Sequence, residues 1–390
     1  MPPNTEPGRI AMVAGEPSGD LLAGLLLGPL KQQWPNTQFW GIGGPRMQSH
    51  GFKSKWPMDA LSVHGYWDAL RNLHTILGIR RALRERVLAE RPALFIGTDA
   101  PDFNLSLEAD LRAAGIKTVH FVSPSIWAWR GERVNRIARS VDLMLCLFPF
   151  EPELYERAGV RAVYVGHPLA DTIPLVPDTE AARKRLKLAP QGGRVVAVLP
   201  GSRMGEVQRI GPIFAETMRL MHSRERNLRF LVPTATPMLR TRIDAQLEPV
   251  RIAGANITVL DGRSHDAIEA CDAVLVASGT ATLECALFKK PMVIAYRAAW
   301  LSALLMRRMG YLPYVGLPNV LAREFVVPEF LQERAQPDMI ADAMFDALND
   351  EVWRRHLAAR FDAMHRELKQ GTGARAAEAI NDLLANGEDA

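Results

Sequence analysis

A short apolar run in the second half of the chain leads into residues that could bind a nucleotide. Residues 274–277 are expected to form a buried strand, and a helix is expected to begin at Thr280. The first turn of a helix carries unpaired N–H groups and partial positive charge, so it suits a phosphate group. Glu284, further along this helix, would lie within reach of ribose hydroxyls. The pattern predicts a diphosphate site at Ser278, Gly279, Thr280 and Ala281. The alternative is an ordinary strand-to-helix corner that binds no ligand.

The elements that must position these residues repeat along the chain. Short apolar runs alternate with helical stretches, which favours parallel sheets with helices on both faces. The predicted strands are 10–14, 39–42, 94–97, 118–122, 143–147, 162–165, 195–199, 230–232, 257–260, 274–277 and 292–295. Most of the unusual loops, such as G-E-P-S-G-D and P-G-S-R, directly follow a predicted strand. Because open α/β sheets bind ligands at the carboxyl ends of their strands, these loops are expected to share one cleft.

The length of the chain indicates two domains. A chain of 390 residues is too long for one hydrophobic core. Three prolines within 167–178 are typical of a connector without regular structure. From residue 337 onward the signals are helical only. We therefore predict an α/β fold of two facing, doubly wound Rossmann-like domains, at 1–170 and 171–349, with a helical tail at 350–390 that could complete the first domain.

The composition argues against several other classes of protein. Lys and Arg total 47 against 43 Asp and Glu, and a net charge of only +4 gives no reason to expect nucleic acid. The three cysteines are widely spaced and predict neither a disulfide framework nor a zinc site. The sequence has no P-loop, no G-x-S-x-G motif and no G-x-G-x-x-G after the first strand. Without a secretion signal or a bilayer-spanning apolar run, the chain is expected to be cytoplasmic.

Several loop motifs together resemble one family. They are V-A-G-E-P-S-G-D at 13–20, G-T-D-A-P-D-F-N at 97–104, V-S-P-S-I-W-A-W-R at 122–130, L-P-G-S-R at 199–203, A-S-G-T-A-T-L-E at 277–284 and L-P-N at 317–319. In this order and spacing they resemble the lipid-A-disaccharide synthases, over nearly the whole chain. Pro17 departs from the Thr that many members carry, so no hydrogen-bonding role is transferred to that position.

The resemblance implies a GT-B-type glycosyltransferase that uses neither a cofactor nor a metal ion. Such an enzyme transfers 2,3-diacylglucosamine from its UDP donor to the 6-hydroxyl of 2,3-diacylglucosamine 1-phosphate (lipid X) and releases UDP. The donor is α-linked and the product β-linked, so a carboxylate must take the hydroxyl proton while other groups stabilise the departing diphosphate. One alternative is another GT-B enzyme of UDP-sugars, such as a UDP-GlcNAc 2-epimerase. The other is a non-catalytic protein that binds nucleotide and lipid.

The first domain is expected to hold the acceptor and the base. Asp99, at the end of a predicted strand, is the expected general base, and Glu16 is its competitor or a group that positions the acceptor sugar. Ser18 and Gly19, in the loop of Glu16, are expected to bring backbone close to the ligand. Asp102 is expected to cap the helix that follows Asp99.

The second domain is expected to hold the UDP-sugar. Arg203 is expected on the leaving diphosphate because a guanidinium group binds two phosphate oxygens at once, with a surface ion pair to Glu206 as the alternative. Glu284 is expected on the ribose. His265 is expected to be a structural or loop residue, with a contact to the edge of the uracil as the alternative. The other expected contacts to substrate are the residues of the helix corner described above and Gly201, Ser202 and Asn319.

An arginine-rich segment of the first domain suggests a surface that meets lipid. Its arginines could contact lipid headgroups, and its apolar residues could accept acyl chains. The alternative is that these apolar residues form the side of a helix that packs against the core. Trp127 and Trp129 are expected to stack on a sugar or line the wall nearby. We therefore expect a peripheral protein on the cytoplasmic face of the inner membrane, with a homodimer as an open option. The apolar residues are Trp56, Leu61, Val63, Tyr66, Trp67, Leu70, Leu73, Ile76, Leu77 and Ile79.

Overall fold

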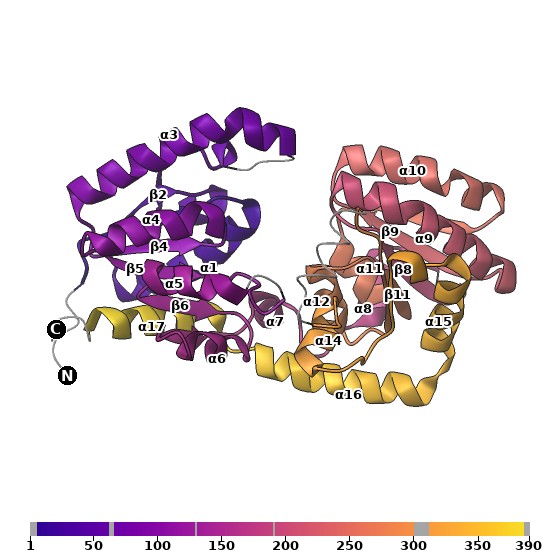
Figure 1. Cartoon of the computed structure of the whole chain (residues 1–390). Coiled ribbons are helices and arrows are strands. Elements are labelled where there is room, and N and C mark those ends of the chain that lie inside the picture. Colours follow the sequence, from indigo (N-terminus) through magenta and orange to yellow (C-terminus); the bar gives the residue numbers. More distant parts are fainter. Residues whose placement is uncertain (1–5, 62–65, 129–130, 190–191, 300–311, 386–390) are drawn as a thin grey trace. The chain divides into compact units, whose positions relative to one another are not determined.

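The computed structural model describes residues 6–61, 66–128, 131–189, 192–299 and 312–385, of which 66–73 by their backbone alone. The chain divides into two compact units. Unit 1 comprises Met1–Asp171 and Glu367–Ala390, and unit 2 comprises Thr172–Arg366. Each unit contains one parallel sheet with helices packed against it (Figure 1).

The sheet of unit 1 has seven strands in the order β3-β2-β1-β4-β5-β6-β7. The strands are β1 (Arg9–Ala14), β2 (Gln38–Ile42), β3 (Lys53–Trp56), β4 (Leu94–Thr98), β5 (Lys117–Phe121), β6 (Leu143–Cys146) and β7 (Ala162–Tyr164). The helices are α1 (Pro17–Gln33), α2 (Pro45–Gln48), α3 (Tyr66–Glu90), α4 (Pro101–Ala113), α5 (Val134–Ser140), α6 (Glu151–Glu156), α7 (Pro168–Thr172) and α17 (Thr372–Ala385).

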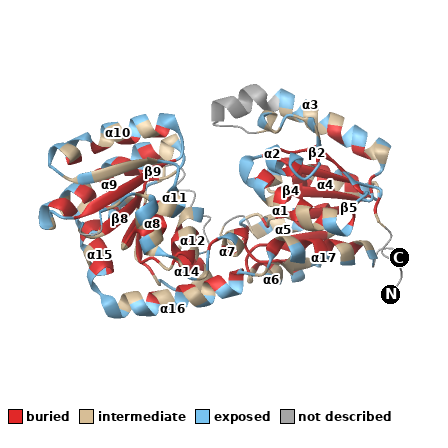
Figure 2. Ribbon diagram, turned by 180° about the vertical axis from the view of Figure 1, so that it is seen from behind, coloured by how far each residue is buried: buried red, intermediate tan, exposed pale blue. Residues whose placement is uncertain are grey.

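Both faces of the strands between the two edges of this sheet are buried, which explains why these strands are mostly apolar. Along β1, Ile10 and Met12 face a core formed with α1 and α17, whereas Ala11 and Val13 face a core formed with α3 and α4. The alternation follows from the two-residue period of a strand. Figure 2 shows β4 and β5 as buried and the outer sides of the helices as exposed. The C-terminal helix α17 thus completes the core of the N-terminal unit.

The sheet of unit 2 has six strands in the order β10-β9-β8-β11-β12-β13. The strands are β8 (Val195–Leu199), β9 (Arg229–Thr234), β10 (Asn256–Asp261), β11 (Ala273–Val276), β12 (Met292–Tyr296) and β13 (Glu329–Leu331). The helices are α8 (Thr179–Arg185), α9 (Met204–Arg224), α10 (Pro237–Ile252), α11 (Ser264–Ala270), α12 (Thr280–Leu287), α14 (Leu317–Ala322) and α15 (Pro337–Asn349). α16 (Glu351–Leu368) begins in unit 2, and its last two residues belong to unit 1.

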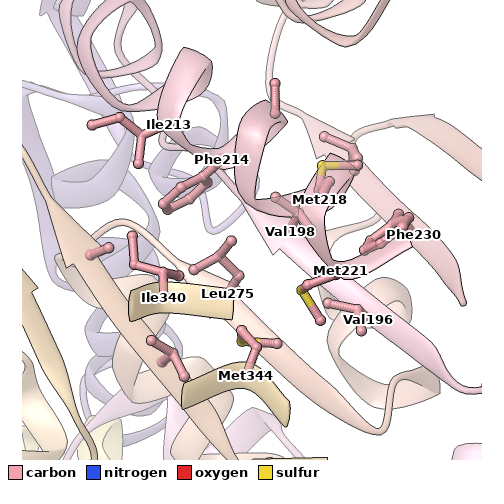
Figure 3. Close-up of a cluster of buried hydrophobic side chains, with 14 of the residues drawn as sticks. Val196, Val198, Ile213, Phe214, Met218, Met221, Phe230, Leu275, Ile340 and Met344 are labelled. Atoms are coloured by element: carbon pink, nitrogen blue, oxygen red, sulfur yellow. The ribbon is translucent and has the colours of Figure 1, made fainter. Parts of the chain in front are cut away.

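The main core of unit 2 lies between the sheet and three helices. Phe214 and Met218 of α9 and Ile340 and Met344 of α15 pack on Val198 and its neighbours (Figure 3). α10 adds further apolar side chains to the same cluster. Because β8 is buried on both of its faces, the loop that follows it starts from a fixed position.

The structure confirms the predicted α/β architecture and differs from the sequence prediction in three places. β3 and β13 were not predicted: β3 reads K-S-K-W without an apolar run, and β13 has only three residues. The predicted connector at 167–178 begins with the helix α7 instead of irregular chain. Pro168 is the first residue of that helix, where proline's fixed φ and missing N–H do no harm.

All three cysteines are buried and have free thiols. Cys146 is the last residue of β6 in unit 1, whereas Cys271 and Cys285 lie in unit 2. Burial raises the pKa of Cys271 to about 11 and also raises the pKa of the other two thiols. The thiols are therefore held in their unreactive protonated form.

Candidate active site

The strand orders place the predicted site residues at one position in each sheet. In unit 1 the order reverses between β1 and β4, and in unit 2 it reverses between β8 and β11. In open α/β sheets the ligand binds outside the carboxyl ends of the strands at this reversal, because the two flanking loops diverge there. The loops that follow these four strands, together with the first turns of the helices after them, contain Glu16 to Asp20, Asp99, Arg203 and Ser278 to Thr280. The predicted residues of each unit therefore belong to the loops that flank its reversal point.

In unit 1 the structure brings Asp99 and Ser18 together. Asp99 follows β4, is half-buried, and receives a hydrogen bond from Ser18 Oγ to its Oδ2 at 3.4 Å. Gly19 lies directly against the end of β4, since a Cβ on it would come within 3.3 Å of the Thr98 carbonyl oxygen. Glu16 is the N-cap residue of α1; its side chain is exposed and does not cap the helix. A hydroxyl, a carboxylate and the start of a helix thus share one corner.

Asp20 has a structural role that the sequence did not reveal. Its buried carboxylate accepts hydrogen bonds from the backbone N–H groups of Gly44 (2.8 Å), Arg46 (2.9 Å) and Met47 (3.1 Å). These groups lie at the start of α2, so the carboxylate holds the loop after β2 against the loop after β1. The loop after β2 borders a cavity of about 410 Å³ whose lining includes Ser54, Lys55, Trp56 and Met58.

Asp102 does not cap α4 as predicted. The N-cap residue is Ala100, and Asp102 lies in the first turn. Its exposed carboxylate pairs with Arg133 at 3.4 Å. The prediction was wrong because the turn after Asp99 is left-handed, with φ of 43° at Ala100, which shifts the helix start by two residues.

An aromatic cluster lies at the carboxyl ends of β5, β6 and β7. Trp127 packs edge-on against Phe148 and Phe150, with ring centroids 6.3 and 5.6 Å apart. Its indole N–H donates to the buried carboxyl of Glu151 at 3.2 Å, and the Phe148 N–H donates to the other oxygen at 3.0 Å. Burial raises the pKa of Glu151 to about 7. The predicted wall residue Trp127 is therefore fixed by protein contacts, whereas Trp129 lies outside the described residues.

In unit 2 the predicted diphosphate site is the start of α12. Gly279 is its N-cap residue with φ of 79°, and Thr280 is its first residue. Gly279 and Thr280 are exposed, and Ser278 and Ala281 are half-buried. The buried hydroxyl of Thr282 donates to the Gly279 carbonyl at 2.8 Å and so fixes the turn. The N–H groups of the first turn are therefore presented in a fixed geometry, as an anion site requires.

Arg203 is the N-cap residue of α9, next to the same reversal point. Its guanidinium lies 3.9 Å from the Glu206 carboxylate, and its side chain is 83% exposed. An ion pair of that length and exposure is weak. The Glu206 carboxylate instead accepts a hydrogen bond from the Arg203 backbone N–H at 3.3 Å. It also lies close to Gly201, whose φ is 113°, because a Cβ on Gly201 would come within 2.7 Å of Glu206 Oε2. The P-G-S-R loop is thus fixed, while the Arg203 side chain extends into solvent beyond Ser202, which is also exposed.

Glu284 pairs with a residue from a neighbouring helix. His265 Nε2, on α11, lies 3.6 Å from Glu284 Oε2 on α12. Hydrogen bonding to this carboxylate raises the pKa of His265. The His265 ring also packs edge-on against Phe288 at 5.4 Å. The sequence predicted a ribose contact for Glu284 and a structural or loop role for His265, and it did not pair the two residues.

Asn319, predicted to contact substrate, is completely buried. Its amide N–H groups donate to the Val327 carbonyl and to Glu329 Oε1, at 2.9 and 2.7 Å. Its oxygen accepts the N–H groups of Val326 and Val327 at 2.8 and 3.0 Å. With these four bonds and no exposed surface, the side chain holds together the segments around α14 and has no free group to offer a ligand.

The predicted lipid surface is only partly within the described structure. Trp56, Leu61, Ile76 and Ile79 pack against the core of unit 1, whereas Leu77 is 41% exposed. Val63 and the side chains of 66–73 lie outside the described residues. Among the helices that the structure describes, none has the length and hydrophobicity to span a bilayer. Within the same residues no group of His, Cys, Asp and Glu side chains could hold a metal ion.

The fold agrees with that of GT-B enzymes of known structure. The glycotransferase of kitacinnamycin aligns with a TM-score of 0.63 at 15% identity, over 97% of this chain and 100% of its own. The UDP-GlcNAc 2-epimerase from Neisseria meningitidis, solved with UDP-GlcNAc, aligns with a TM-score of 0.62 at 10% identity, over 97% and 100% of the two chains. At such low identity these likenesses bear on the fold alone, which is an α/β fold of the GT-B class.

The sequence comparisons are far more specific. Residues 10–381 match the family model described as lipid-A-disaccharide synthetase. A lipid-A-disaccharide synthase from Burkholderia mallei is 56% identical over 381 residues, which cover 97% of each chain. The corresponding enzyme of Burkholderia vietnamiensis is 56% identical over 387 residues and 98% of each chain. With the motifs at the reversal points of both sheets, these matches show that the chain belongs to the lipid-A-disaccharide synthase family.

Proposed function

We propose that the chain is an inverting, metal-independent glycosyltransferase that makes the lipid A disaccharide. It transfers 2,3-diacylglucosamine from UDP to the 6-hydroxyl of 2,3-diacylglucosamine 1-phosphate and releases UDP. The observation that carries this proposal is the placement of complementary groups at the two reversal points: a half-buried carboxylate in unit 1 and an exposed guanidinium beside a helix start in unit 2. Family membership supplies the identity of the two sugars.

Unit 2 is proposed to bind the UDP part of the donor. The diphosphate would accept hydrogen bonds from the first turn of α12 and from the hydroxyls of Ser278 and Thr280. Arg203 would bind two oxygens of the same group and stabilise the negative charge that grows as the sugar leaves. Glu284, oriented by His265, would accept the ribose hydroxyls. Because Arg203 has only a weak protein partner, binding it to a diphosphate breaks no strong contact.

Unit 1 is proposed to bind the acceptor and remove its proton. The acceptor hydroxyl oxygen attacks the anomeric carbon of the donor as the bond to UDP breaks, and the hydroxyl proton passes to the Asp99 carboxylate. Ser18 orients that carboxylate through its bond to Oδ2. Glu16, exposed at the start of α1, would contact the hydroxyls of the acceptor sugar. The cavity beside Trp56 and Met58 would admit part of one apolar chain.

The acceptor and the donor both carry acyl chains, so the enzyme must take them from a lipid surface. We propose that unit 1 meets the cytoplasmic face of the inner membrane through its arginine-rich segment. Arg80 lies about one turn after the exposed Leu77 on α3. Arg84 and Arg86 follow further along the same helix, where they pair with Asp110 and Glu90. Basic groups beside exposed apolar residues favour an anionic membrane surface.

The test is release of UDP by the purified protein. With both lipid substrates present we expect UDP and the disaccharide 1-phosphate in equal amounts, and neither product when one lipid is left out. Asp99→Asn should lose most of the activity while binding UDP normally. Turnover of UDP-GlcNAc without lipid would instead favour an epimerase, and an active Asp99→Asn would transfer the role of the base to Glu16.

A further inference from the structure

The backbone that carries Asp99 has an unfavourable conformation. Asp99 and Ala100 have φ angles of 54° and 43°, so two consecutive residues with a Cβ are left-handed. That conformation brings the Cβ too close to the backbone and persists only where neighbouring groups hold it. The strain lies at the residue whose carboxylate must face the acceptor.

Hydrogen bonds on both sides hold this strained segment. The Asp99 N–H donates to the Phe121 carbonyl on β5 at 2.9 Å. The Asn104 side chain donates to the Asp99 carbonyl at 2.8 Å and reaches the Thr98 carbonyl at 3.4 Å. Within the D-A-P-D-F-N motif, the last residue, Asn104, therefore binds the backbone of the first, Asp99.

Next to Asn104 lies a buried hydrogen-bonded pair, Glu108 and His120. Glu108 follows one turn later on the same side of α4, and its carboxylate lies 2.8 and 3.0 Å from His120 Nδ1. Asn104, Glu108 and His120 are all fully buried. A Cβ on Gly97 would lie 2.1 Å from Glu108 Oε1 and 2.9 Å from Asn104 Cβ, so both side chains pack directly on β4 two residues before Asp99.

This polar group is poorly satisfied for a purely structural feature. Asn104 Oδ1 and His120 Nε2 are buried and have no hydrogen-bond partner in the part of the chain that the structure describes. Leaving such atoms unpaired in a core is unfavourable, and apolar side chains of the same shape would fill the space at less cost. We therefore look for a role of these three residues other than stabilising the fold.

We propose that Asn104 is the positioning residue of Asp99, and that the buried Glu108–His120 pair holds Asn104 against β4. Asn104 keeps the left-handed turn in place and thereby aims the Asp99 carboxylate. The inference rests on the proposed function, in which Asp99 is the base. It adds a group that never contacts substrate and acts through the backbone alone.

The decisive variant is Asn104→Leu, which keeps the volume and removes the donor. We expect kcat to fall at least tenfold while KM for both lipids changes less than twofold. In the free protein, hydrogen exchange of the Asp99 amide should become faster. Leu107→Ala is the matched control, since Leu107 is buried on the same helix against a different part of the core. It should lose stability and keep kcat within twofold.

A second variant separates this inference from the proposed function. In the Asp99→Asn background, Asn104→Leu should lower the residual kcat less than twofold further. If Asp99→Asn is inactive while Asn104→Leu keeps the parent kcat, the positioning role is refuted and the base stands. If Asp99→Asn is fully active, the role of Asp99 as the base is refuted. If hydrogen exchange of the Asp99 amide is unchanged in Asn104→Leu, the proposal that Asn104 holds the turn is refuted, whatever the activity.

Discussion

Two buried titratable groups of unit 1 predict pH dependences of opposite sign that cancel in the parent protein. Burial raises the pKa of Glu151 from 4.5 to about 7 and lowers the pKa of His167 from 6.5 to about 4. Both groups contact Phe148: Glu151 accepts its backbone N–H, and the His167 ring lies 5.6 Å from its ring. Each group is therefore neutral in the folded protein over much of the acidic range.

The signs follow from counting protons. Between pH 4.5 and 7 the folded state keeps the Glu151 proton that the unfolded state loses, so Glu151 makes stability fall as the pH rises. Between pH 4 and 6.5 the unfolded state binds a proton on His167 that the folded state does not, so His167 makes stability rise. At about 1.4 kcal/mol per pKa unit, each contribution amounts to roughly 3 kcal/mol. From pH 4.5 to 6.5 the two nearly cancel.

Single variants should expose each contribution. We would measure urea denaturation by tryptophan fluorescence from pH 4 to 8 for the parent, Glu151→Gln and His167→Asn. The free energy of the parent minus that of Glu151→Gln should fall by about 3 kcal/mol from pH 4.5 to 7. The same difference for His167→Asn should rise by a similar amount from pH 4 to 6.5. Glu153→Gln, on the exposed side of α6, is the control for loss of a carboxylate from this helix, and it should change the free energy of unfolding at pH 7 by less than about 0.5 kcal/mol. Parallel curves for the parent and Glu151→Gln would refute the reasoning.

Three further substitutions test other parts of the structure. Asp20→Ala leaves three N–H groups at the start of α2 without their acceptor, so urea denaturation should show a loss of about 3 kcal/mol. Arg203→Ala should leave the free energy of unfolding within about 0.5 kcal/mol of the parent, because its side chain is exposed, while calorimetry shows at least tenfold weaker binding of UDP. Ala100→Gly should raise the free energy of unfolding by about 1 kcal/mol, because glycine adopts the left-handed turn without strain.

The architecture was predictable because both faces of each sheet are covered. β1, β4, β8 and β11 are continuous apolar runs, and such runs separated by helical stretches have few other solutions. Strands at the sheet edges do not have this property. β3, with exposed Lys53 and Lys55, lies at one edge of its sheet and has the polar sequence expected of an edge strand.

The site was predictable where a residue's place follows from its own loop. Gly279, Thr280 and Arg203 lie at helix starts directly after strands, so local sequence fixes their position. Partners from elsewhere in the chain were not predictable. The amide of Asn319 binds a segment that follows it by seven to ten residues, and Glu108 on α4 binds His120 on β5. The sequence around a single buried polar residue does not indicate which distant residue will be its hydrogen-bond partner.

The buried cysteines allow the opening of each unit to be followed separately. A thiol reagent such as Ellman's reagent cannot reach Cys146 unless unit 1 opens, and cannot reach Cys271 or Cys285 unless unit 2 opens. Peptide mapping of the labelled sites after a timed pulse would therefore yield two separate opening rates from one sample. Addition of UDP should slow labelling at Cys271 and Cys285 more than at Cys146, which would show which unit the nucleotide stabilises.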